Sequence, residues 1–589
     1  MRVLLDGNTY ELDGGVQREA IPEWPQYQPD TGKRKREDRA FISSYAKESW
    51  SGGFGIQRGL PELDLDRFWD AGAETRFPSQ ITPPILPVQD TITPLLALGQ
   101  MFNFGNELYA ITAGSLSQHY IYKYTLGSGW GSYNSLGTFG AGLMCGIVEK
   151  NGRLHSLAWN TIGSLGIKWA TWFSVGSVSG TQYLATDMTS WLSAPVSAVS
   201  ITNMAKPSVL VTGTEIDLTT IYPNRIGMAA YEPDTISSSF FRTPGVFRVK
   251  GADYRNMGAT GGIVAVGDYE IWEDRTGVNS SLMFELENNP DIGRGIISWN
   301  RNIIIPGKDV ILGYLEDDTV TPIFLDDGFP DDMKGAFTAS TKSLQYLFLG
   351  KSADAGSKAS IISYDGLGWQ SVWRDDVASR LISRMSISNL DPVARLHFFI
   401  VPTLSIQQGA TLAYHLPYIM SNPRTEASLS VATTGYFTDV QYGGYSPEVP
   451  AGFYRVGIFG EALGSPHIIT VCFGIDGANP VSTLGQVSSS GQYLNFGNVG
   501  TKGNYIQMKY ILQRGTLAAT YPRFTLAVLD YMKTPSLRES WLFSIDTAKT
   551  ARELQLGEEQ IISNLRTSQQ KATLLPFNYG QMGTKNIRI

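Results

Sequence analysis

From residue 98 to residue 422 the chain repeats a short pattern of strand-like runs and turns, and this repetition limits the possible folds most. Each unit of about 40 to 50 residues offers three or four apolar or alternating runs separated by Gly, Asn, Asp or Ser. Such repeats are typical of a β-propeller, in which each blade packs against its neighbours. About seven blades are predicted, at 98–140, 141–190, 191–237, 238–291, 292–335, 336–378 and 379–422.

The composition agrees with a fold made mainly of β-strands. The chain of 589 residues holds 62 Gly, 28 Tyr, 26 Phe and 13 Trp, the residues that pleated strands and tight turns use. With 42% hydrophobic and 17% charged residues it is an ordered globular protein. We therefore predict a mainly β fold throughout, apart from a short C-terminal α+β tail.

The aromatic residues of the propeller are explained by packing alone. "YKYTLGSGWGSY" at 122–133 and "ISYDGLGWQSVW" at 362–373 both show a strand, a glycine turn, a tryptophan and a second strand. Packing between blades favours large flat side chains. We therefore interpret the following residues as core between blades and not as ligand contacts: Trp130, Trp159, Trp272, Trp369, His119, His155, His397 and His415.

The sequence predicts three further parts around the propeller of 98–423. Residues 1–97 form an N-terminal hairpin around Asp6-Gly7-Asn8 and an irregular arm, and 424–545 alternates as a β-sandwich or jelly roll does. Residues 546–589 hold a helix capped by Asp546 or Thr547 and interrupted by Gly557, followed by a terminal strand. We expect this tail to dock on a neighbour.

Charge, cysteine content and hydropathy exclude several classes. The net charge of −7 gives no basic footprint for nucleic acid, and the basic run 33–36 is followed at once by Glu37 and Asp38. Cys145 and Cys472 lie in separate apolar strand-like contexts and are expected to be small buried hydrophobes. No segment reaches the length of a membrane span, and no signal peptide is predicted.

A search for catalytic motifs yields little. The sequence has no Gly-rich phosphate loop, CxxC, HExxH or GxSxG. "SYDGLGW" at 363–369 resembles a sialidase Asp box, but its Trp comes one position early, so we expect a blade turn. The sequence predicts no catalytic, cofactor-binding or metal-binding residue and no cofactor.

Clustered carboxylates are the remaining candidates for chemistry. They lie at 316–318 and in "FLDDGFPDDMKG", which contains Asp326, Asp327, Asp331 and Asp332. A glycoside hydrolase needs two facing carboxyl groups, whereas adjacent acids on a Gly/Pro loop indicate a solvated turn. The spacing of an EF-hand calcium loop is also missing.

The irregular segment at 49–87 lies ahead of the main body and is rich in aromatic residues and glycines. We expect aromatic anchors in it, and glycines that let the backbone pass close to another surface, so that the segment clamps across the propeller or a neighbouring subunit. The predicted assembly residues are Trp50, Gly52, Gly53, Phe54, Gly55, Phe68 and Trp69.

Several features together resemble structural proteins of tailed bacteriophages and related prophages. These are the N-terminal "DG" hairpin, "ESWSGGFG" at 48–55, a Pro-rich lead into the propeller, and a later β domain with "IQMKYILQRG" at 506–515. The resemblance covers most of the chain and rests on pattern and domain order. It implies a virion component of the tail tip, baseplate or tail fibre, made in the host cytoplasm.

The resemblance also implies the partners. These are other phage tail proteins, further copies of the chain in a cyclic homo-oligomer, and a glycan on the host cell surface. Two alternatives to a structural role stay open: a receptor-binding protein that recognises a surface glycan, and a propeller glycoside hydrolase that uses Asp326, Asp327, Asp331 or Asp332. Neither nucleic acid nor a membrane span is expected.

Overall fold

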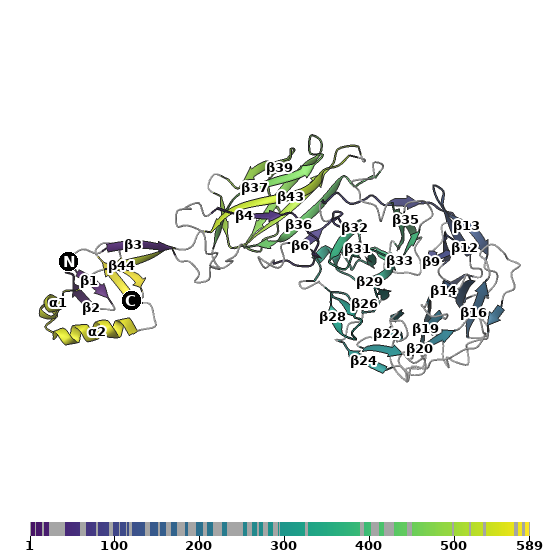
Figure 1. Ribbon diagram of the computed structural model, residues 1–589, viewed down its shortest axis with the longest axis horizontal. Helices are drawn as coiled ribbons and strands as arrows, with labels where there is room; N and C mark the ends of the chain where they lie inside the picture. Colours follow the sequence, from purple (N-terminus) through teal and green to yellow (C-terminus); the bar gives the residue numbers. More distant parts are fainter. Residues whose placement is uncertain are drawn as a thin grey trace. The chain divides into compact units, whose positions relative to one another are not determined.

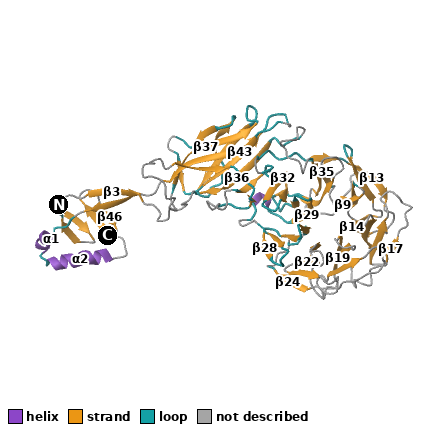
Figure 2. Cartoon of the chain, in the orientation of Figure 1, coloured by secondary structure: helices purple, strands orange, loops and turns teal. Residues whose placement is uncertain are grey.

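A computed structural model defines the fold, which is mainly β as predicted (Figure 2). It describes residues 2–5, 8–13, 17–22, 42–58, 66–77, 80–93, 98–104, 106–112, 115–116, 120–135, 142–150, 153–160, 166–172, 183–185, 196–203, 209–215, 226–231, 251–255, 262–267, 270–274, 281–286, 292–293, 295–323, 328–388, 394–401, 411–417, 429–443, 450–497, 500–517, 520–533, 537–542, 544–570, 575–579 and 584–587. No described helix is long and apolar enough to cross a membrane.

The chain divides into two compact units. The smaller unit combines Met1–Phe41, Ser446–Gly452 and Met532–Ile589, and the larger combines Ile42–Tyr445 and Phe453–Tyr531. This division differs from the predicted one, in which the N-terminal hairpin and the C-terminal tail are separate parts. Backbone pairing between the two ends of the chain brings them together, and no local sequence pattern reports such a pairing.

The smaller unit is a four-stranded sheet with two helices (Figure 1). Its strand order is β2 (Asn8–Glu11), β1 (Arg2–Leu5), β45 (Leu575–Tyr579), β46 (Thr584–Ile587). A separate ladder joins β3 (Gln17–Pro22) to β44 (Leu537–Leu542). The buried core contains Val3, Leu5, Tyr10, Leu12, Ala551 and Ile561.

The helices begin and end where their sequence signals predict. The Asp546 carboxylate accepts a hydrogen bond of 2.8 Å from the backbone N–H of Lys549 and so caps α1 (Thr547–Leu554). Gln555 adopts a left-handed conformation at the end of α1. Gly557 then separates α1 from α2 (Glu558–Gln570).

In the larger unit, the described residues form seven successive sheets of antiparallel strands (Figure 1). The strand order of the first sheet is β8 (Ile92–Thr93), β13 (Gly129–Ser135), β12 (Tyr120–Thr125), β10 (Glu107–Thr112), β9 (Leu98–Phe104). The strand order of the second sheet is β11 (Ser115–Leu116), β14 (Gly142–Lys150), β15 (Arg153–Asn160), β16 (Gly166–Trp172), β17 (Tyr183–Ala185). The third sheet consists of β18 (Val196–Asn203), β19 (Val209–Glu215) and β20 (Ile226–Tyr231). The fourth consists of β21 (Gly251–Arg255), β22 (Gly262–Val266), β23 (Glu270–Asp274) and β24 (Ser281–Glu285). Among the described strands of these first four sheets, only β8 runs parallel to its neighbour.

The remaining sheets follow the same plan. The fifth is β25 (Ile297–Trp299), β26 (Asn302–Pro306), β27 (Ile311–Tyr314), β28 (Val320–Pro322), and a 3-10 turn, η3 (Asp331–Met333), comes after it. The sixth is β29 (Phe337–Lys342), β30 (Leu347–Lys351), β31 (Lys358–Tyr364), β32 (Trp369–Ala378), and the seventh is β33 (Leu381–Ser388), β34 (Arg395–Val401), β35 (Leu412–Leu416), β7 (Val88–Asp90). Strands β7 and β8 therefore come from residues that the sequence assigned to the arm.

Successive sheets lie beside one another from the first to the third and from the fourth to the seventh. Strand β14 contacts β9 and β18, β25 contacts β21 and β29, and β33 contacts both β29 and β9. The seventh sheet thus lies next to the first. Trp130 is buried between them and packs against Phe399 with ring centroids 5.3 Å apart.

The other predicted core aromatics have mixed outcomes. Trp369 is fully buried, and its Nε1 donates to the Ile323 carbonyl at 3.0 Å. Trp272 is half-buried and donates to the Glu270 carboxylate at 2.7 Å. Cys472 is buried, as expected. The side chains of Trp159, His155 and Cys145, and all of His119 and the basic run 33–36, lie outside the described residues.

The sixth sheet continues into a second β region of the larger unit. Beyond β32 the strand order is β5 (Gly53–Phe54), β6 (Arg67–Ala71), β36 (Thr434–Tyr442), β42 (Ile506–Gln513), β38 (Ile468–Ile475), β39 (Ser482–Val487). A further sheet holds β4 (Ile42–Lys47), β43 (Arg523–Lys533), β37 (Ala451–Glu461) and β40 (Gln492–Asn495), with β41 (Thr501–Gly503) paired to β37. Phe524 of β43 packs on Tyr510 of β42 at 4.8 Å, so the two sheets face each other.

Candidate functional site

The predicted assembly residues lie where the arm joins the sixth sheet to the second β region. Strand β5 pairs in parallel with β32 through Gly53 and Trp369, and with β6 through Phe54 and Phe68. Strand β6 then pairs antiparallel with β36. The arm thus supplies the two strands that make one continuous sheet of ten.

The aromatic anchors of the arm are part of the core of the larger unit. Trp50, Phe54 and Phe68 are at most 2% exposed, whereas Trp69 is half-buried. Trp50 donates from Nε1 to the Phe77 carbonyl at 3.0 Å and packs against Phe437 of β36. These residues therefore contact other segments of their own chain.

The glycines of the arm permit a close approach of two backbones. Gly53 has φ +79°, and a Cβ atom there would lie 2.4 Å from the backbone N and O of Trp369. A Cβ atom on Gly52 would lie 2.6 Å from Cγ of Arg67, and Gly55 has φ +106°. The surface that Gly53 approaches in the structure is β32 of the same chain.

A cluster of charged side chains around the buried Arg374 guanidinium lies beside the arm. Arg374 of β32 donates to the Asp70 carboxylate at 2.7 Å, to Asp332 at 2.9 Å and to the Tyr436 hydroxyl. Burial opposes the charge on Arg374, but Asp70, with Tyr436 and Asp332, raises its pKa above the usual value. Burial, and then the Asp70 carboxylate, raises the pKa of Tyr436. The cluster therefore joins the sixth sheet to the arm by the ion pair with Asp70 and to β36 by the side-chain hydrogen bond with Tyr436.

The described carboxylates that suggested glycan hydrolysis are engaged in contacts within the chain. Asp318 accepts from Arg255 at 2.6 Å, and Glu316 accepts from Arg301 at 3.2 Å. Asp331 pairs with Lys334 at 2.7 Å. Asp326 and Asp327 lie outside the described residues.

The Asp-box-like stretch 363–369 is a turn between two strands of the sixth sheet, as predicted. The Asp365 carboxylate accepts hydrogen bonds from the backbone N–H groups of Leu367 at 2.8 Å and Gly368 at 3.1 Å. This pattern is an Asx turn, which fixes the backbone locally.

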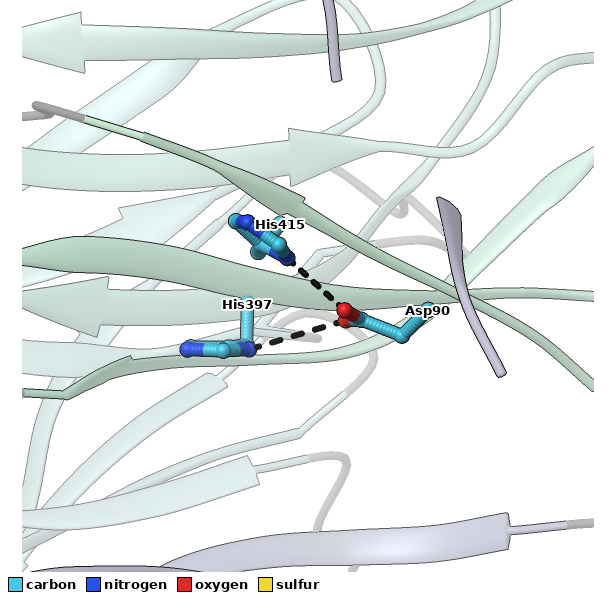
Figure 3. Close-up of side chains that lie close together, drawn as sticks. All are labelled: Asp90, His397 and His415. Atoms are coloured by element: carbon cyan, nitrogen blue, oxygen red, sulfur yellow. Dashed lines mark hydrogen bonds and ion pairs between the residues drawn. The ribbon is translucent and has the colours of Figure 1, made fainter. Parts of the chain in front are cut away.

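A second cluster, which the sequence did not predict, lies in the seventh sheet. Asp90 of β7, His397 of β34 and His415 of β35 bring their ligand atoms within 4.8 Å of one another (Figure 3). Nδ1 of His415 lies 2.8 Å from Oδ1 of Asp90, and Nδ1 of His397 lies 3.9 Å from Oδ2. We call these three residues the Asp–His–His cluster.

Strand register places the three side chains on one face. His397 is directly opposite His415 in the β34–β35 ladder. His415 is opposite Val88 in the next ladder, and Asp90 is two positions along from Val88. Because side chains alternate between the two faces of a sheet, Val88 and Asp90 share the face of His415.

The surroundings of the cluster are buried and aromatic. His397 is fully buried, and its Nε2 lies 2.8 Å from the Ser388 hydroxyl. The Tyr124 ring, from the first sheet, meets the His397 ring edge-on at 4.5 Å. Burial lowers the pKa of His397 well below its ordinary value, and His415 and Arg395 add to the effect. The ring is therefore neutral at neutral pH.

The sequence analysis identified two of the three residues of this cluster, and it interpreted both as core residues. His397 and His415 were interpreted as core residues, and both are indeed buried. Asp90 was not singled out, because 325 positions separate it from His415. The strand periodicity of 412–416 indicates on which face His415 lies, but nothing local indicates that β7 is the neighbouring strand.

Comparison with solved structures gives distant similarities, two of which are described below. No family model and no curated protein matches the chain. The solved structure of BBS1N in complex with ARL6DN, soaked with mercury, is 9% identical with a TM-score of 0.38, and the match covers 58% of this chain and 99% of that one. The structure of the exo-beta-1,3-galactanase of Phanerochaete chrysosporium with galactose is 11% identical with a TM-score of 0.26, and the match covers 65% of this chain and 95% of that one. At these TM-scores neither similarity carries an argument about function.

Proposed function

We propose that this chain is a structural component of a tailed-phage virion, in the tail tip, baseplate or tail fibre. In this proposal the seven sheets are the blades of a β-propeller, and the two facing sheets beyond the arm are a β-sandwich. Contacts of the seventh sheet with the first support the ring, and β7, from ahead of the repeats, is the outermost strand of the last blade.

The observation that carries the proposal is the way the arm joins these two parts. Strands β5 and β6 continue the sixth sheet into the second β region through backbone pairing, and the ion pairs of Arg374 cross the same junction. A continuous hydrogen-bonded sheet resists separation of its parts far better than a flexible linker does. In the proposal, this junction holds the propeller and the β-sandwich together while they contact other tail proteins.

The proposed partners are other tail proteins and further copies of this chain. A closed homo-oligomer is the usual form of a symmetric assembly part. Multi-angle light scattering on the purified protein measures the copy number, and a monomer at all concentrations would count against self-assembly outside the particle.

The placement is tested by immunogold electron microscopy of intact virions with an antibody against residues 424–545. We expect label at the tail end only. Particles from a phage that lacks the gene provide the control, and label on the capsid, or on no particle, would contradict the proposal.

A glycan role is tested separately, since a tail protein can also bind the host. Binding of the purified chain to host polysaccharide on an array would make it a receptor-binding protein. Release of reducing ends that alanine at Asp331 or Asp332 abolishes would make it a hydrolase. Binding without release distinguishes the first of these roles from the second.

A further inference from the structure

We propose that Asp90, His397 and His415 bind a divalent transition-metal ion of the zinc class. Imidazole nitrogens and a carboxylate are the donors that Zn²⁺ accepts, at about 2.0 to 2.2 Å each. Donor atoms that share one ion then lie about 3 to 4 Å apart. The distances of 2.8 and 3.9 Å from Asp90 to the two histidines fit that spacing with small adjustments.

Two buried atoms of the cluster lack a hydrogen-bond partner, and both are atoms that can bind a cation. Nδ1 of His397 and Oδ2 of Asp90 are buried without a partner and lie 3.9 Å from each other. That distance is too long for a hydrogen bond. An unpaired buried nitrogen and carboxylate oxygen are costly, and a metal ion between them would satisfy both.

The residues around the cluster fit a closed structural metal site. The Ser388 hydroxyl on Nε2 of His397 holds the ring in place, as outer-shell partners of metal-binding histidines do. The Tyr124 hydroxyl lies 3.4 Å from Nδ1 of His415, and its oxygen could serve as a fourth ligand. Tyr124 is also buried, so the ion would be shielded from solvent.

The proposed ion would fasten the outermost strand of the seventh sheet. Strand β7 is three residues long, and it is held to β35 by its backbone ladder. A bond from Asp90 through the ion to His397 would reach past β35 to β34. We therefore expect the metal to stabilise the closure of the seven sheets, whether or not the protein belongs to a virion.

The test is metal binding by the purified full-length chain. After removal of metal with a chelator, Zn²⁺ is added back, and bound zinc is measured by mass spectrometry together with the Tm. We expect about one zinc per chain, with a rise in Tm that saturates at that ratio. Co²⁺ in place of Zn²⁺ should give the visible absorption of a site with nitrogen and oxygen ligands.

Matched variants separate the site from adventitious binding. Asp90→Asn and His415→Gln preserve size and should lose zinc and the rise in Tm. Ser388→Ala, which changes only a positioning residue, should weaken zinc binding about tenfold or more. His467→Ala removes an imidazole of the larger unit that lies outside the cluster and should bind zinc as the wild type does.

Three outcomes would overturn the proposal. The first is wild-type protein that takes up no zinc and shows no rise in Tm. The second is zinc binding that Asp90→Asn and His415→Gln leave intact in folded protein. The third is stabilisation by Ca²⁺ or Mg²⁺ and not by Zn²⁺ or Co²⁺.

Discussion

Buried ion pairs hold charged side chains in the interior of the larger unit. Arg76 and Glu74 form an ion pair of 2.7 Å in which both side chains are inaccessible to solvent. Lys47 and Asp439 pair at 3.2 Å in a similarly buried place. The partners of Arg374 come from three separate segments. Removing one member of such a group leaves the others desolvated and unpaired.

Arg374→Ala should lower the free energy of unfolding of the larger unit by about 3 to 5 kcal/mol, because Asp70 loses its buried cation. Chemical denaturation followed by tryptophan fluorescence measures the change. Arg301→Ala is the control, since the Arg301–Glu316 pair is 69% and 55% exposed and such pairs contribute about 0 to 1 kcal/mol. Equal effects of the two substitutions would contradict the assigned role of Arg374.

Gly53→Ala should destabilise the larger unit far more than Gly127→Ala. Both glycines have φ +79°, so both substitutions carry the same backbone strain, about 1 to 2 kcal/mol. At Gly53 the new methyl group also meets the Trp369 backbone at 2.4 Å, whereas at Gly127 nothing lies within 4 Å. The difference between the two Tm values measures the close approach of β5 to β32, and no difference would refute it.

At the scale of elements, the N-terminal hairpin and helix α1 hold each other in place. The Glu11 backbone N–H donates to the Thr550 hydroxyl at 2.9 Å. The Glu11 carboxylate accepts from Arg2 and pairs with Lys549 at 3.2 Å. The Arg2 hydrogen bond lowers the pKa of Glu11 below its ordinary value, although burial opposes it, and Lys549 adds to the lowering. The carboxylate is therefore bound in its ionised form.

The smaller unit should lose stability as the pH falls below about 4.5. A carboxyl group whose folded pKa is lowered contributes stability above its unfolded pKa, and that contribution is lost as the pH falls through the folded pKa. Glu11→Gln should therefore lower the Tm of this unit at pH 7, and the difference from the wild type should shrink as the pH falls. A difference that stays the same at low pH would assign the effect to packing instead.

At the scale of the whole molecule, each unit has its own hydrophobic core. The core of the smaller unit contains Ala551 and Ile561 of the two helices. The larger unit has separate clusters, one of which contains Ile303 and Ile305 of the fifth sheet. Units with separate cores unfold as separate cooperative transitions when few contacts couple them.

Ile561→Ala should lower only the transition of the smaller unit, by about 2 to 5 kcal/mol, because Ile561 is fully buried there. Differential scanning calorimetry resolves the two transitions. Ile562→Ala is the control, since the neighbouring residue is 40% exposed and should cost less than about 1 kcal/mol. A shift of both transitions by Ile561→Ala would show that the units unfold together.

Several features follow from local patterns, and the structure agrees with them. Met508, Tyr510 and Leu512 alternate in the sequence and are all buried in β42. The predicted unit 336–378 contains the four strands of the sixth sheet, and Asp546 caps α1. Side-chain periodicity, turn residues and helix caps act over a few positions, so they can be recognised in a single sequence.

The pairing of distant segments was decided by the tertiary structure alone. The aromatic and glycine content of 50–55 indicated a close backbone approach, but not that β32 is the surface approached. In the same way, the sequence determined the strands of both termini, and only the fold determined that β1 pairs with β45 and that Asp90 joins His397 and His415. The physical reason is that a strand edge offers the same N–H and C=O groups to any other edge. Burial of the whole chain selects the partner.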